Sequence, residues 1–570
     1  MIRATDHSTG LLFDRWSHLG PRQRKILDAS WPGVFRNYLL HTLPVGLIAV
    51  HFDARHGRPT KELYTVLGAL ILQHMFDFSD EEVQRALMFN LEWHYALDIP
   101  DASEENTYLA ERTLRNYRAL ILKEGLASVI FGASTDELIT AFEVDAAKQR
   151  MDSTHMQSNM RKLGRIRLFA ATIRAFLKAL KRSHKKAFAA SISQELIDRY
   201  LAKDSDGCFS RVKPSESSKT LSQVSRDLLT LVEMFSAHNA IQKMETYDLL
   251  ERVLREQCTV TGEGTEKKVT VKPPKEVPSD SLQNPSDPDA SYNGHKGQGY
   301  EVQLMETYQA GERDPKIPNL ITYFDVNPAH VHDSAELLPA LDATEKRNCC
   351  PEHLVCDTHY GSDENVLAAE EKGVTVVAPV AGPAPAESIT LAQFSPDPET
   401  GYVTRCPEGH APLTMRQTET QRLIAAFPKK TCQACPRQKD CPVKLEKKAA
   451  YLRYDLPSLR CSVRRAREHT PEFREKYRWR AGIEGTNSHL KSDFGMGRLR
   501  VRGLESVRLA VAFKALGLNI MRCARALAAC FLICFRLFPA KITSREHLYS
   551  RIRTLFEKIT PFSLKTQLVA

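Results

Sequence analysis

Long apolar runs are absent from this sequence of 570 residues. A membrane-spanning helix needs roughly 20 predominantly apolar residues. The nearest approach, ALAACFLICF at Ala526–Phe535, is much shorter and lies between Arg525 and Arg536. It is typical of a buried helix, with an interfacial helix or a partner surface as the alternative. The opening MIRATDHSTG has no apolar segment of the kind that directs secretion. We therefore expect a cytoplasmic protein with no membrane partner.

A disulfide framework is also unexpected, because the 13 cysteines are odd in number and no secretory signal precedes them. Four of them, Cys406, Cys432, Cys435 and Cys441, combine a C-x2-C pair with two outlying thiols. Such a set suits tetrahedral Zn²⁺, and it predicts a Cys-rich, zinc-ribbon-like insertion over about residues 395–450. His410 could replace one thiolate. Free buried thiols and redox chemistry are the alternatives.

Acidic residues are outnumbered, which gives a formal net charge of +10. The imbalance is concentrated, since residues 459–508 hold 13 Lys/Arg against 6 Asp/Glu. A basic stretch of this kind suits a polyanion such as nucleic acid. A solvated basic face is the simpler alternative.

Residues 1–135 read as helical. TKELYTVLGALILQHMF has helical apolar spacing, and Ser79 with Glu82 forms a capping box for the helix that follows it. Two helices joined by a short turn fit either a helix-turn-helix DNA reader or a plain helical bundle. A strand is expected around residues 142–158, then a helical block at about 162–258 and a surface loop at about 259–290.

Strand patterns dominate after the loop. GQGYEVQLMETY and PNLITYFDVNPAH read as consecutive strands, and HLVCDTHYG and VTVVAPV as later ones. Helical segments DSAELLPALDATEK and ENVLAAEEKG separate these later strands. This alternation predicts an α/β layer structure with a partly parallel sheet.

Three acids draw attention within this framework. Asp152 lies in RMDSTHM, and Asp357 ends an apolar strand in HLVCDTHYG. Either acid alone is more often a turn or cap residue. Phosphoryl transfer on nucleic acid, however, uses a few carboxylates that converge on two metal ions. Asp145 and Asp363 lie close to these two acids in the sequence, and we prefer Asp152 and Asp357 for their strand positions.

The third acid, Glu484, lies in YRWRAGIEGTNSHLK. At about 100° per residue, a continuous helix would place Tyr477, Arg480, Glu484 and Lys491 within an arc of about 60°. A guanidinium and an ammonium on one face can hold phosphates. The simpler reading is an intrahelical Arg480–Glu484 pair of a few tenths of a kcal/mol. The glycines on either side of Glu484 indicate close approach of another group.

These residues resemble a known family. Tyr-x2-Arg-x3-Glu-x6-Lys is similar to the signature around the third acid of a large group of DDE transposases from bacterial insertion sequences. MDSTHMQSN and CDTHYGSDEN resemble the first and second acid blocks of that group, and GRPTKELYTVLGALILQHMFDFSDEEVQRAL resembles the helical domain that precedes its catalytic core. The resemblance covers about residues 15–525.

The resemblance implies a multidomain α/β protein with a ribonuclease H-like catalytic core. That core would span residues 136–522, with the helical and Cys-rich segments as insertions. An all-α DNA-binding domain at 1–135 would precede it, and a helical tail at 523–570 would follow. Asp152, Asp357 and Glu484 would bind two Mg²⁺, with Mn²⁺ as a substitute. Water would cleave the end of the element, and the freed 3′-hydroxyl would attack target DNA.

By the same resemblance, the partners are double-stranded DNA, as terminal inverted repeats and target, and a second copy of the chain on paired ends. Bound to DNA, the protein would be associated with the bacterial nucleoid. An inactive DNA-binding derivative and a ribonuclease H-like nuclease without strand transfer are the alternatives. His295 and Lys296 could equally form a surface turn. The expected DNA contacts are Tyr477, Arg480, Lys491, His295, Lys296, Arg498, Arg500 and Arg502.

Overall fold

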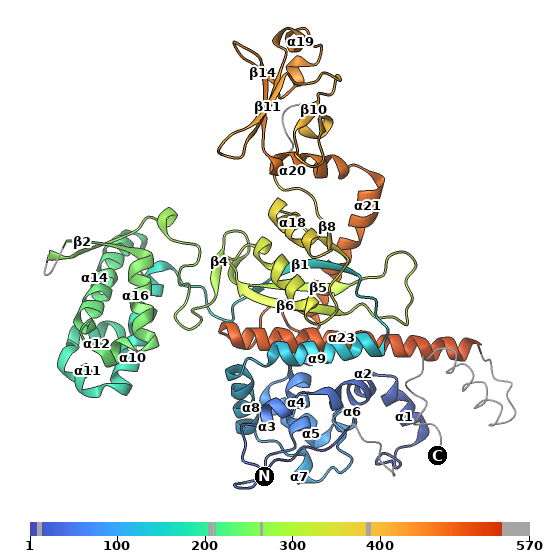
Figure 1. The fold of residues 1–570 in the computed structure, drawn as a ribbon. Helices are drawn as coiled ribbons and strands as arrows, with labels where there is room; N and C mark the ends of the chain where they lie inside the picture. Colours follow the sequence, from blue (N-terminus) through green and yellow to red (C-terminus); the bar gives the residue numbers. More distant parts are fainter. Residues whose placement is uncertain (8–13, 203–208, 210–211, 263–265, 384–388, 538–570) are drawn as a thin grey trace.

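The computed structural model describes residues 1–7, 14–202, 209, 212–262, 266–383 and 389–537, and only the backbone for 531–537. A mixed α/β sheet lies at the centre of the molecule, with the N-terminal helices on one side of it (Figure 1). A helical lobe and a Cys-rich lobe project from this centre in two other directions. The expectation of a helical N-terminal region followed by a mixed α/β domain is confirmed.

The N-terminal region is a bundle built around α4 (Leu63–Met75), which is buried on nearly every face. α4 is therefore a core element and packs against the long helix α23. The capping box at the start of the next helix is present, since the Glu82 amide donates to Ser79 Oγ at 3.2 Å and the Ser79 amide donates to Glu82 Oε2 at 2.6 Å. The other helices are α1 (Pro21–Asp28), α2 (Trp31–Val34), η1 (Phe35–Leu39), η2 (Leu40–Thr42), α3 (Gly46–Ala49), α5 (Asp80–Phe89), α6 (Leu91–Ala96), α7 (Glu104–Thr107), α8 (Glu111–Lys123) and α9 (Ala127–Ala141).

The central sheet has its longest strands in the middle. Its strands are β1 (Lys148–Gln157), β4 (Ser291–Asn293), β5 (Gly297–Thr307), β6 (Ile321–Pro328), β7 (His353–Cys356) and β8 (Thr375–Val377). The order is β4–β5–β1–β7–β8, and β6 also pairs with β5. β5 runs antiparallel to β1 and β6, while β7 runs parallel to β1 and β8. The helices among the later strands are η6 (Asp333–Glu336), α17 (Leu337–Glu345), η7 (Thr358–Tyr360) and α18 (Asp363–Glu371).

The helical lobe leaves the sheet after β1 and returns at β4 (Figure 1). Its helices are α10 (Arg165–Ser183), α11 (Lys185–Ser191), α12 (Gln194–Tyr200), η3 (Pro214–Glu216), α14 (Ser217–Phe235), α15 (Asn239–Gln242) and α16 (Glu245–Gln257). The expected loop at 259–290 is wrong in its first part, where β2 (Cys258–Thr261) and β3 (Lys268–Val271) form a hairpin. Their β-branched residues, TVT and VTV, supply the strand preference. From residue 272 to 290, all of which the structure describes, the short helix η5 (Pro274–Glu276) is the one regular element.

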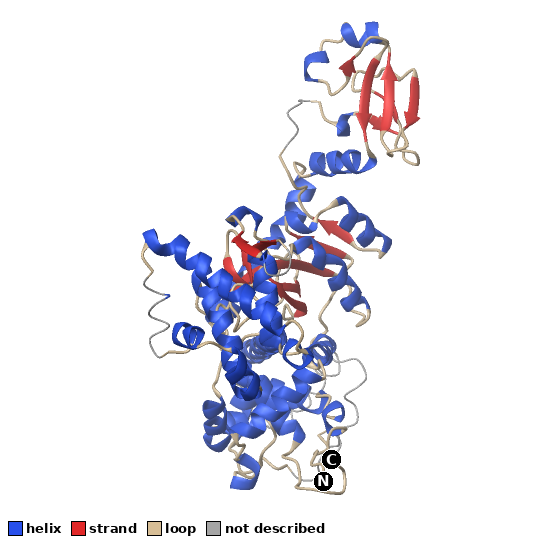
Figure 2. Ribbon diagram, turned by 90° about the vertical axis from the view of Figure 1, so that its left-hand side faces the viewer, coloured by secondary structure: helices blue, strands red, loops and turns tan. Residues whose placement is uncertain are grey.

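The Cys-rich lobe contains a four-stranded antiparallel sheet of order β11–β12–β14–β13. Figure 2 shows this lobe standing clear of the central sheet. Its inner face and α20 share one apolar core. The elements are η8 (Leu391–Gln393), β9 (Ser395–Pro396), β10 (Val403–Arg405), β11 (Thr414–Gln417), β12 (Leu423–Phe427), α19 (Lys429–Gln433), η9 (Gln438–Asp440), β13 (Lys444–Leu445), β14 (Ala450–Tyr454) and α20 (Leu456–Arg467).

The chain then returns to the central sheet through α21 (Pro471–Tyr477), η10 (Arg478–Ala481), α22 (Gly482–Ser492) and α23 (Leu504–Leu537). α23 lies between the sheet and the N-terminal helices, in contact with β6, α4 and α9 (Figure 1). It continues without a break through residues 522 and 523, so the boundary expected there falls inside a helix. Residues 538–570 of the expected tail lie outside the described residues. Among the described helices, none could span a membrane.

Candidate active site

Strand register brings the first two acids together. β1 and β7 are parallel neighbours, and Met151 pairs with Cys356. Asp152 and Asp357 directly follow these two residues, so they lie side by side in the middle of the sheet, at the point where β7 ends. Asp152 is 8% exposed, whereas the side chain of Asp357 is 35% exposed. Asp357 also caps η7, because the Thr358 amide donates to its carboxylate at 2.6 Å. The pair thus has one buried and one accessible carboxylate.

The segment carrying Glu484 is not the continuous α-helix assumed from the sequence. α21 ends at Tyr477, a 3₁₀ turn holds Arg480, and α22 begins at Gly482. The arc calculated for a continuous α-helix therefore does not apply, although Tyr477 lies close enough to Arg480 to interact with it electrostatically. Tyr477 stacks on Phe473 at 5.5 Å between ring centroids and packs against the apolar ends of β7 and β8. Glu484 and Lys491 instead line an open depression on α22 with Asn487, Ser488 and Ser492.

Arg480 joins the three acids. Its Nη2 atom is 3.2 Å from Asp152 Oδ1 and 3.7 Å from Asp357 Oδ2, and its Nη1 atom donates to Glu484 Oε1 at 3.0 Å. The guanidinium therefore lies between carboxylates that come from β1, from the end of β7 and from α22. The three acids expected to act together therefore meet around a single guanidinium.

Burial sets the protonation of this site. It raises the pKa of Asp152 to about 6, against the opposing effect of Arg480. For Arg480, burial is outweighed by the charges of Asp152 and Asp357, which raise its pKa. Burial lowers the pKa of Lys491, with Glu301 acting in the opposite direction. Burial therefore disfavours the ionised form of Asp152, and a nearby cation is needed to stabilise it.

A buried ionic cluster behind the acids fixes the segment that carries Glu484. Glu306 of β5 accepts from Arg150 Nε at 2.8 Å, from Arg522 Nη1 at 2.8 Å and from Thr486 Oγ1 at 2.7 Å. Arg150 also donates to the Trp479 carbonyl at 2.8 Å. The cluster therefore ties β1, β5, η10, α22 and α23 together, and sequence reasoning missed it. Its only signal in the sequence was the presence of charged residues, Arg150 and Glu306, within two segments that read as strands.

The two glycines beside Glu484 have different environments. A Cβ atom on Gly482 would lie 1.9 Å from Arg150 Nη1, so a side chain here would collide with the buried cluster. A Cβ atom on Gly485 would meet no atom within 4 Å. The expectation of close approach therefore holds for Gly482, and the approaching group is Arg150. Gly485 faces open space.

The competing acids have structural partners. Asp363 forms a bidentate pair with Arg460, with its Oδ2 atom 2.6 Å from Nη2. Asp145 is exposed and accepts from the Ala147 amide at 2.9 Å in a turn. Both interactions are typical of scaffold residues. The geometry therefore favours Asp152 and Asp357 as the pair that meets Glu484.

The expected DNA contacts from the β4–β5 hairpin lie in a turn. His295 and Lys296 are exposed between β4 and β5, where the amides of both donate to Asn293 Oδ1. Lys296 also forms an ion pair with the buried Glu301. The surface turn that competed with the DNA-contact reading is therefore present. Lys296 and Lys491 lie close enough to influence each other electrostatically.

The three arginines after α22 are exposed, and two of them have partners. Arg500 Nε is 3.3 Å from Asp77 Oδ2 in the N-terminal bundle, and Arg502 Nη1 donates to Met160 Sδ at 3.2 Å. Arg498 forms a parallel bridge with Gln157 at the end of β1. The segment thus lies against the end of β1 and the N-terminal bundle. By contrast, some of the basic residues between 459 and 508 make contacts within the protein. Arg464 of α20, for example, donates to the Gly361 carbonyl at 2.9 Å.

The four cysteines of the predicted zinc site lie in one lobe. Cys406, Cys432 and Cys441 pack against the same apolar core, and burial together with the neighbouring thiols raises the pKa of Cys432 to about 11. The Cys406 amide donates to the His410 carbonyl at 2.9 Å. Across the described residues, no group of three or more His, Cys, Asp or Glu has the arrangement to hold a metal. The zinc site stays a prediction.

Two family models match the chain. Residues 405–524 match a transposase DDE domain, and residues 40–120 match a transposase domain, DUF772. The first match includes Glu484 and its helix, and the second covers most of the N-terminal bundle. No curated protein matches the chain. The two matches support the assignment of this chain to the insertion-sequence DDE transposases, as the resemblance in the sequence indicated.

Proposed function

We propose that this chain binds the ends of an insertion sequence, cleaves them by metal-dependent hydrolysis of a phosphodiester and joins the 3′-hydroxyl to target DNA. The convergence of Asp152, Asp357 and Glu484 on Arg480 carries this proposal. Pairing two element ends makes a homodimer the natural assembly. The strand order, with an antiparallel β6–β5–β1 half and a parallel β1–β7–β8 half, supports a ribonuclease H-like core.

The chemistry of the donors fits divalent magnesium. Three carboxylates are oxygen ligands of the kind Mg²⁺ prefers, and the buried Oδ1 atom of Asn487 has no hydrogen-bond partner beside Asp152. When bound, the two ions would activate the attacking water and stabilise the charge on the phosphate. Arg480 now supplies the positive charge between the carboxylates, so the three acids could gather around metal only after this guanidinium turns outward.

Residues around the acids have defined roles in the proposal. Arg480 can exchange its carboxylate partners for a phosphate, which it would hold with two hydrogen bonds. Lys491 lies close enough to Asp152 and Lys296 to interact with both electrostatically, and the two lysines can hold the DNA strand as point charges. Tyr477, His295, Arg498, Arg500 and Arg502 complete the set of proposed DNA contacts. In the Cys-rich lobe, Cys406, Cys432, Cys435 and Cys441 are proposed to bind structural zinc.

One experiment tests the proposal directly. The protein is incubated with Mg²⁺, labelled element-end DNA and a target plasmid, alongside the variants Asp152→Asn, Asp357→Asn and Glu484→Gln. We expect cleaved and joined products from the wild type and a loss of at least about 10³-fold in each variant, because metal and electrostatic stabilisation supply several kcal/mol. The matched control is Asp145→Asn, which should keep full activity.

The other outcomes separate the alternatives. Binding without cleavage by the wild type would indicate an inactive DNA-binding derivative. Cleavage without joining would indicate a nuclease. Retained cleavage in Asp152→Asn or Asp357→Asn would overturn the assignment of the acids.

A further inference from the structure

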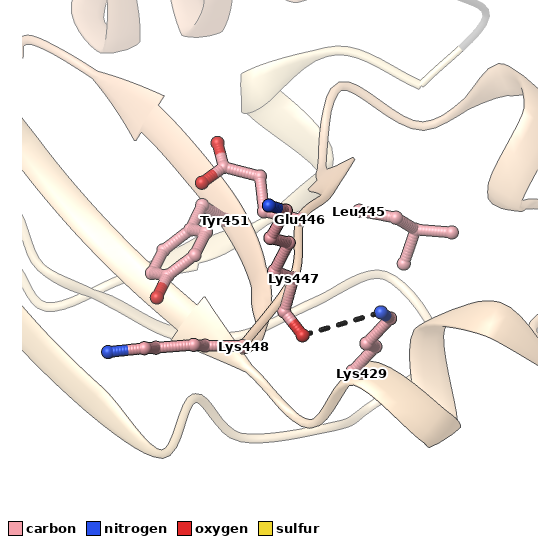
Figure 3. Close-up of a pocket in the computed structure, with 6 residues that line it drawn as sticks. All are labelled: Lys429, Leu445, Glu446, Lys447, Lys448 and Tyr451. Carbon is pink, nitrogen blue, oxygen red and sulfur yellow. Dashed lines mark hydrogen bonds between the residues drawn. The ribbon is translucent and has the colours of Figure 1, made fainter.

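The Cys-rich lobe has an excess of positively charged residues. Residues 389–454 contain eleven Lys/Arg against six Asp/Glu. Three of the lysines meet where α19 approaches the β13–β14 hairpin, and Lys429 Nζ donates to the Lys447 carbonyl at 3.4 Å. These three lysines, Lys429, Lys447 and Lys448, line one open depression together with Tyr451 (Figure 3). We call Lys429, Lys447, Lys448 and Tyr451 the lysine corner.

The positive charge of the lysine corner is not neutralised nearby. Glu446 also lines the depression, but its carboxylate is 2.6 Å from Arg453 Nη1. None of the three lysines forms an ion pair with another described residue. Like charges that gather on a surface repel one another, so their concentration here indicates an external anion rather than a contribution to folding.

The shape of the lysine corner suits an extended ligand. Leu445 is its one aliphatic lining residue, so it lacks the apolar enclosure typical of a small-molecule site. Tyr451 lies on the outer face of the sheet, because its neighbour Leu452 faces the lobe's core. In Figure 3, the side chains of Tyr451 and Lys448 lie together on one flank of the depression, and Lys429 lies on another. An aromatic ring between ammonium groups can contact both sugar and phosphate.

The lobe contacts the part of the sheet domain that carries Asp357. Leu459 of α20 belongs to the lobe's apolar core. α20 is attached to the sheet domain through Arg460, which pairs with Asp363 at 2.6 Å a few residues after Asp357. The lobe is also inserted in the sequence between Asp357 and Glu484. The lysine corner therefore belongs to a lobe that is joined to the sheet domain close to Asp357, as a second contact on one continuous ligand requires.

We propose that the lysine corner binds the phosphate backbone of duplex DNA outside the active site, as an accessory contact to DNA that the acids hold. This inference rests on the proposed function. It gives the Cys-rich lobe a role in substrate binding that does not depend on whether zinc is bound. The contact would be independent of sequence, because phosphates carry no base information.

The test compares two variants of equal charge in the full chain. Lys429→Gln/Lys447→Gln/Lys448→Gln removes the lysine corner. Lys275→Gln/Lys316→Gln/Lys346→Gln removes three exposed lysines from other surfaces. Both lower the formal charge from +10 to +7. Binding of a labelled 40-base-pair duplex is followed by fluorescence anisotropy in EDTA over a range of salt concentrations, so that cleavage plays no part.

We expect the first variant to bind on the order of tenfold more weakly at moderate salt, and its salt dependence to be shallower by up to about 2.7, which is about 0.9 for each lost phosphate contact. The control should bind like the wild type. Equal binding by both variants would overturn this inference and leave the proposed function standing. A wild type that binds no duplex at all would overturn both.

Acetylation of the wild type provides a measurement that needs no variant. Lys447 and Lys448 should become protected from acetic anhydride when duplex DNA is present, as measured by mass spectrometry, while Lys275 should react equally with and without DNA. Unchanged reactivity of Lys447 and Lys448 would contradict the proposal. Protection by an RNA duplex but not by the DNA duplex would also overturn it.

Discussion

Two buried carboxylates on neighbouring strands of the central sheet have opposite environments. Glu306 is fully buried and accepts from two arginines and a threonine, and the charges of Arg522 and Arg150 overcome the effect of burial and lower its pKa. Asp152 has one arginine as its cationic partner, which it shares with two other acids, and burial raises its pKa to about 6. The same sheet thus holds one carboxylate whose charge is satisfied and one that still requires a cation.

The difference separates scaffold from site. A satisfied cluster fixes the backbone of β1 and α22, because Arg150 and Thr486 reach from both to Glu306. An unsatisfied carboxylate on that fixed backbone can accept a metal or a proton without local rearrangement of the strand. Strongly perturbed carboxylates are often found at functional sites for this reason.

Removing the Glu306 charge should have the largest effect. Glu306→Gln leaves Arg150 and Arg522 as buried cations without a carboxylate, which costs about 3–5 kcal/mol of unfolding free energy. Asp152→Asn is the matched control and should be as stable as the wild type or more stable, because it removes a charge that burial disfavours. Urea unfolding at pH 7.5 measures both. Equal stability of the two variants would show that the charges of Glu306 and Asp152 contribute equally to the unfolding free energy.

Alanine substitutions at Gly482 and Gly485 test how tightly the buried cluster packs against α22. Gly482→Ala places a methyl group against Arg150 and should destabilise the protein by up to about 3 kcal/mol, as overpacking does in cores. Gly485→Ala adds the same methyl in open space on the same helix, and the better helix propensity of alanine should stabilise it by up to about 1 kcal/mol. Thermal unfolding compares the pair. A destabilised Gly485→Ala would mean that this face is packed.

His74, which lies where the N-terminal bundle contacts α23, makes the stability of the protein depend on pH. Burial, with Lys514 and Arg118, lowers the pKa of His74 to about 3. Although the residue is half-buried, its Nε2 atom is shielded and has no partner. Below its ordinary pKa of 6.5 the unfolded chain takes up a proton that the folded chain refuses, so stability falls with falling pH, by up to about 2 kcal/mol at pH 5.

Unfolding in urea at pH 7.5 and pH 5 measures this loss. His74→Phe keeps a ring against Phe513 and removes the titration, so its stability should depend less on pH over this range. His56→Gln, a change at an exposed histidine, should lose stability on acidification as the wild type does. An unchanged pH dependence in His74→Phe would contradict the role of His74.

Patterns that local physics determines were readable from the sequence. Apolar periodicity gave the main helices and strands, and the capping box at Ser79 was present as expected. These patterns placed Asp152 on a strand and Asp357 at the end of another, and the structure has Asp152 within β1 and Asp357 directly after β7. Their adjacency needed one further fact, the pairing of β1 with β7, which depends on contacts about 200 residues apart.

The rest depended on tertiary contacts that no local pattern encodes. The 3₁₀ turn at η10 breaks the single helix assumed from Tyr477 to Lys491. In the same region, Arg150 reaches past Gly482 to the Trp479 carbonyl. The partners of Glu306 come from three distant segments, so the charged residues in the strand segments did not reveal which groups would meet. Distance in sequence, rather than weak local preference, limited the prediction.

The smallest expected effect on stability is at Glu484, and it completes the comparison. Its side chain is 64% exposed and pairs with Arg480 four residues away, an arrangement worth about 0.3–0.5 kcal/mol. Glu484→Gln should therefore change the unfolding free energy by less than about 0.5 kcal/mol while abolishing cleavage. Glu306→Gln, a change in the buried cluster that holds η10 and α22, should reduce both the unfolding free energy and cleavage. If Glu484→Gln instead destabilised the protein as strongly as Glu306→Gln, Glu484 would belong to the scaffold and not to the site.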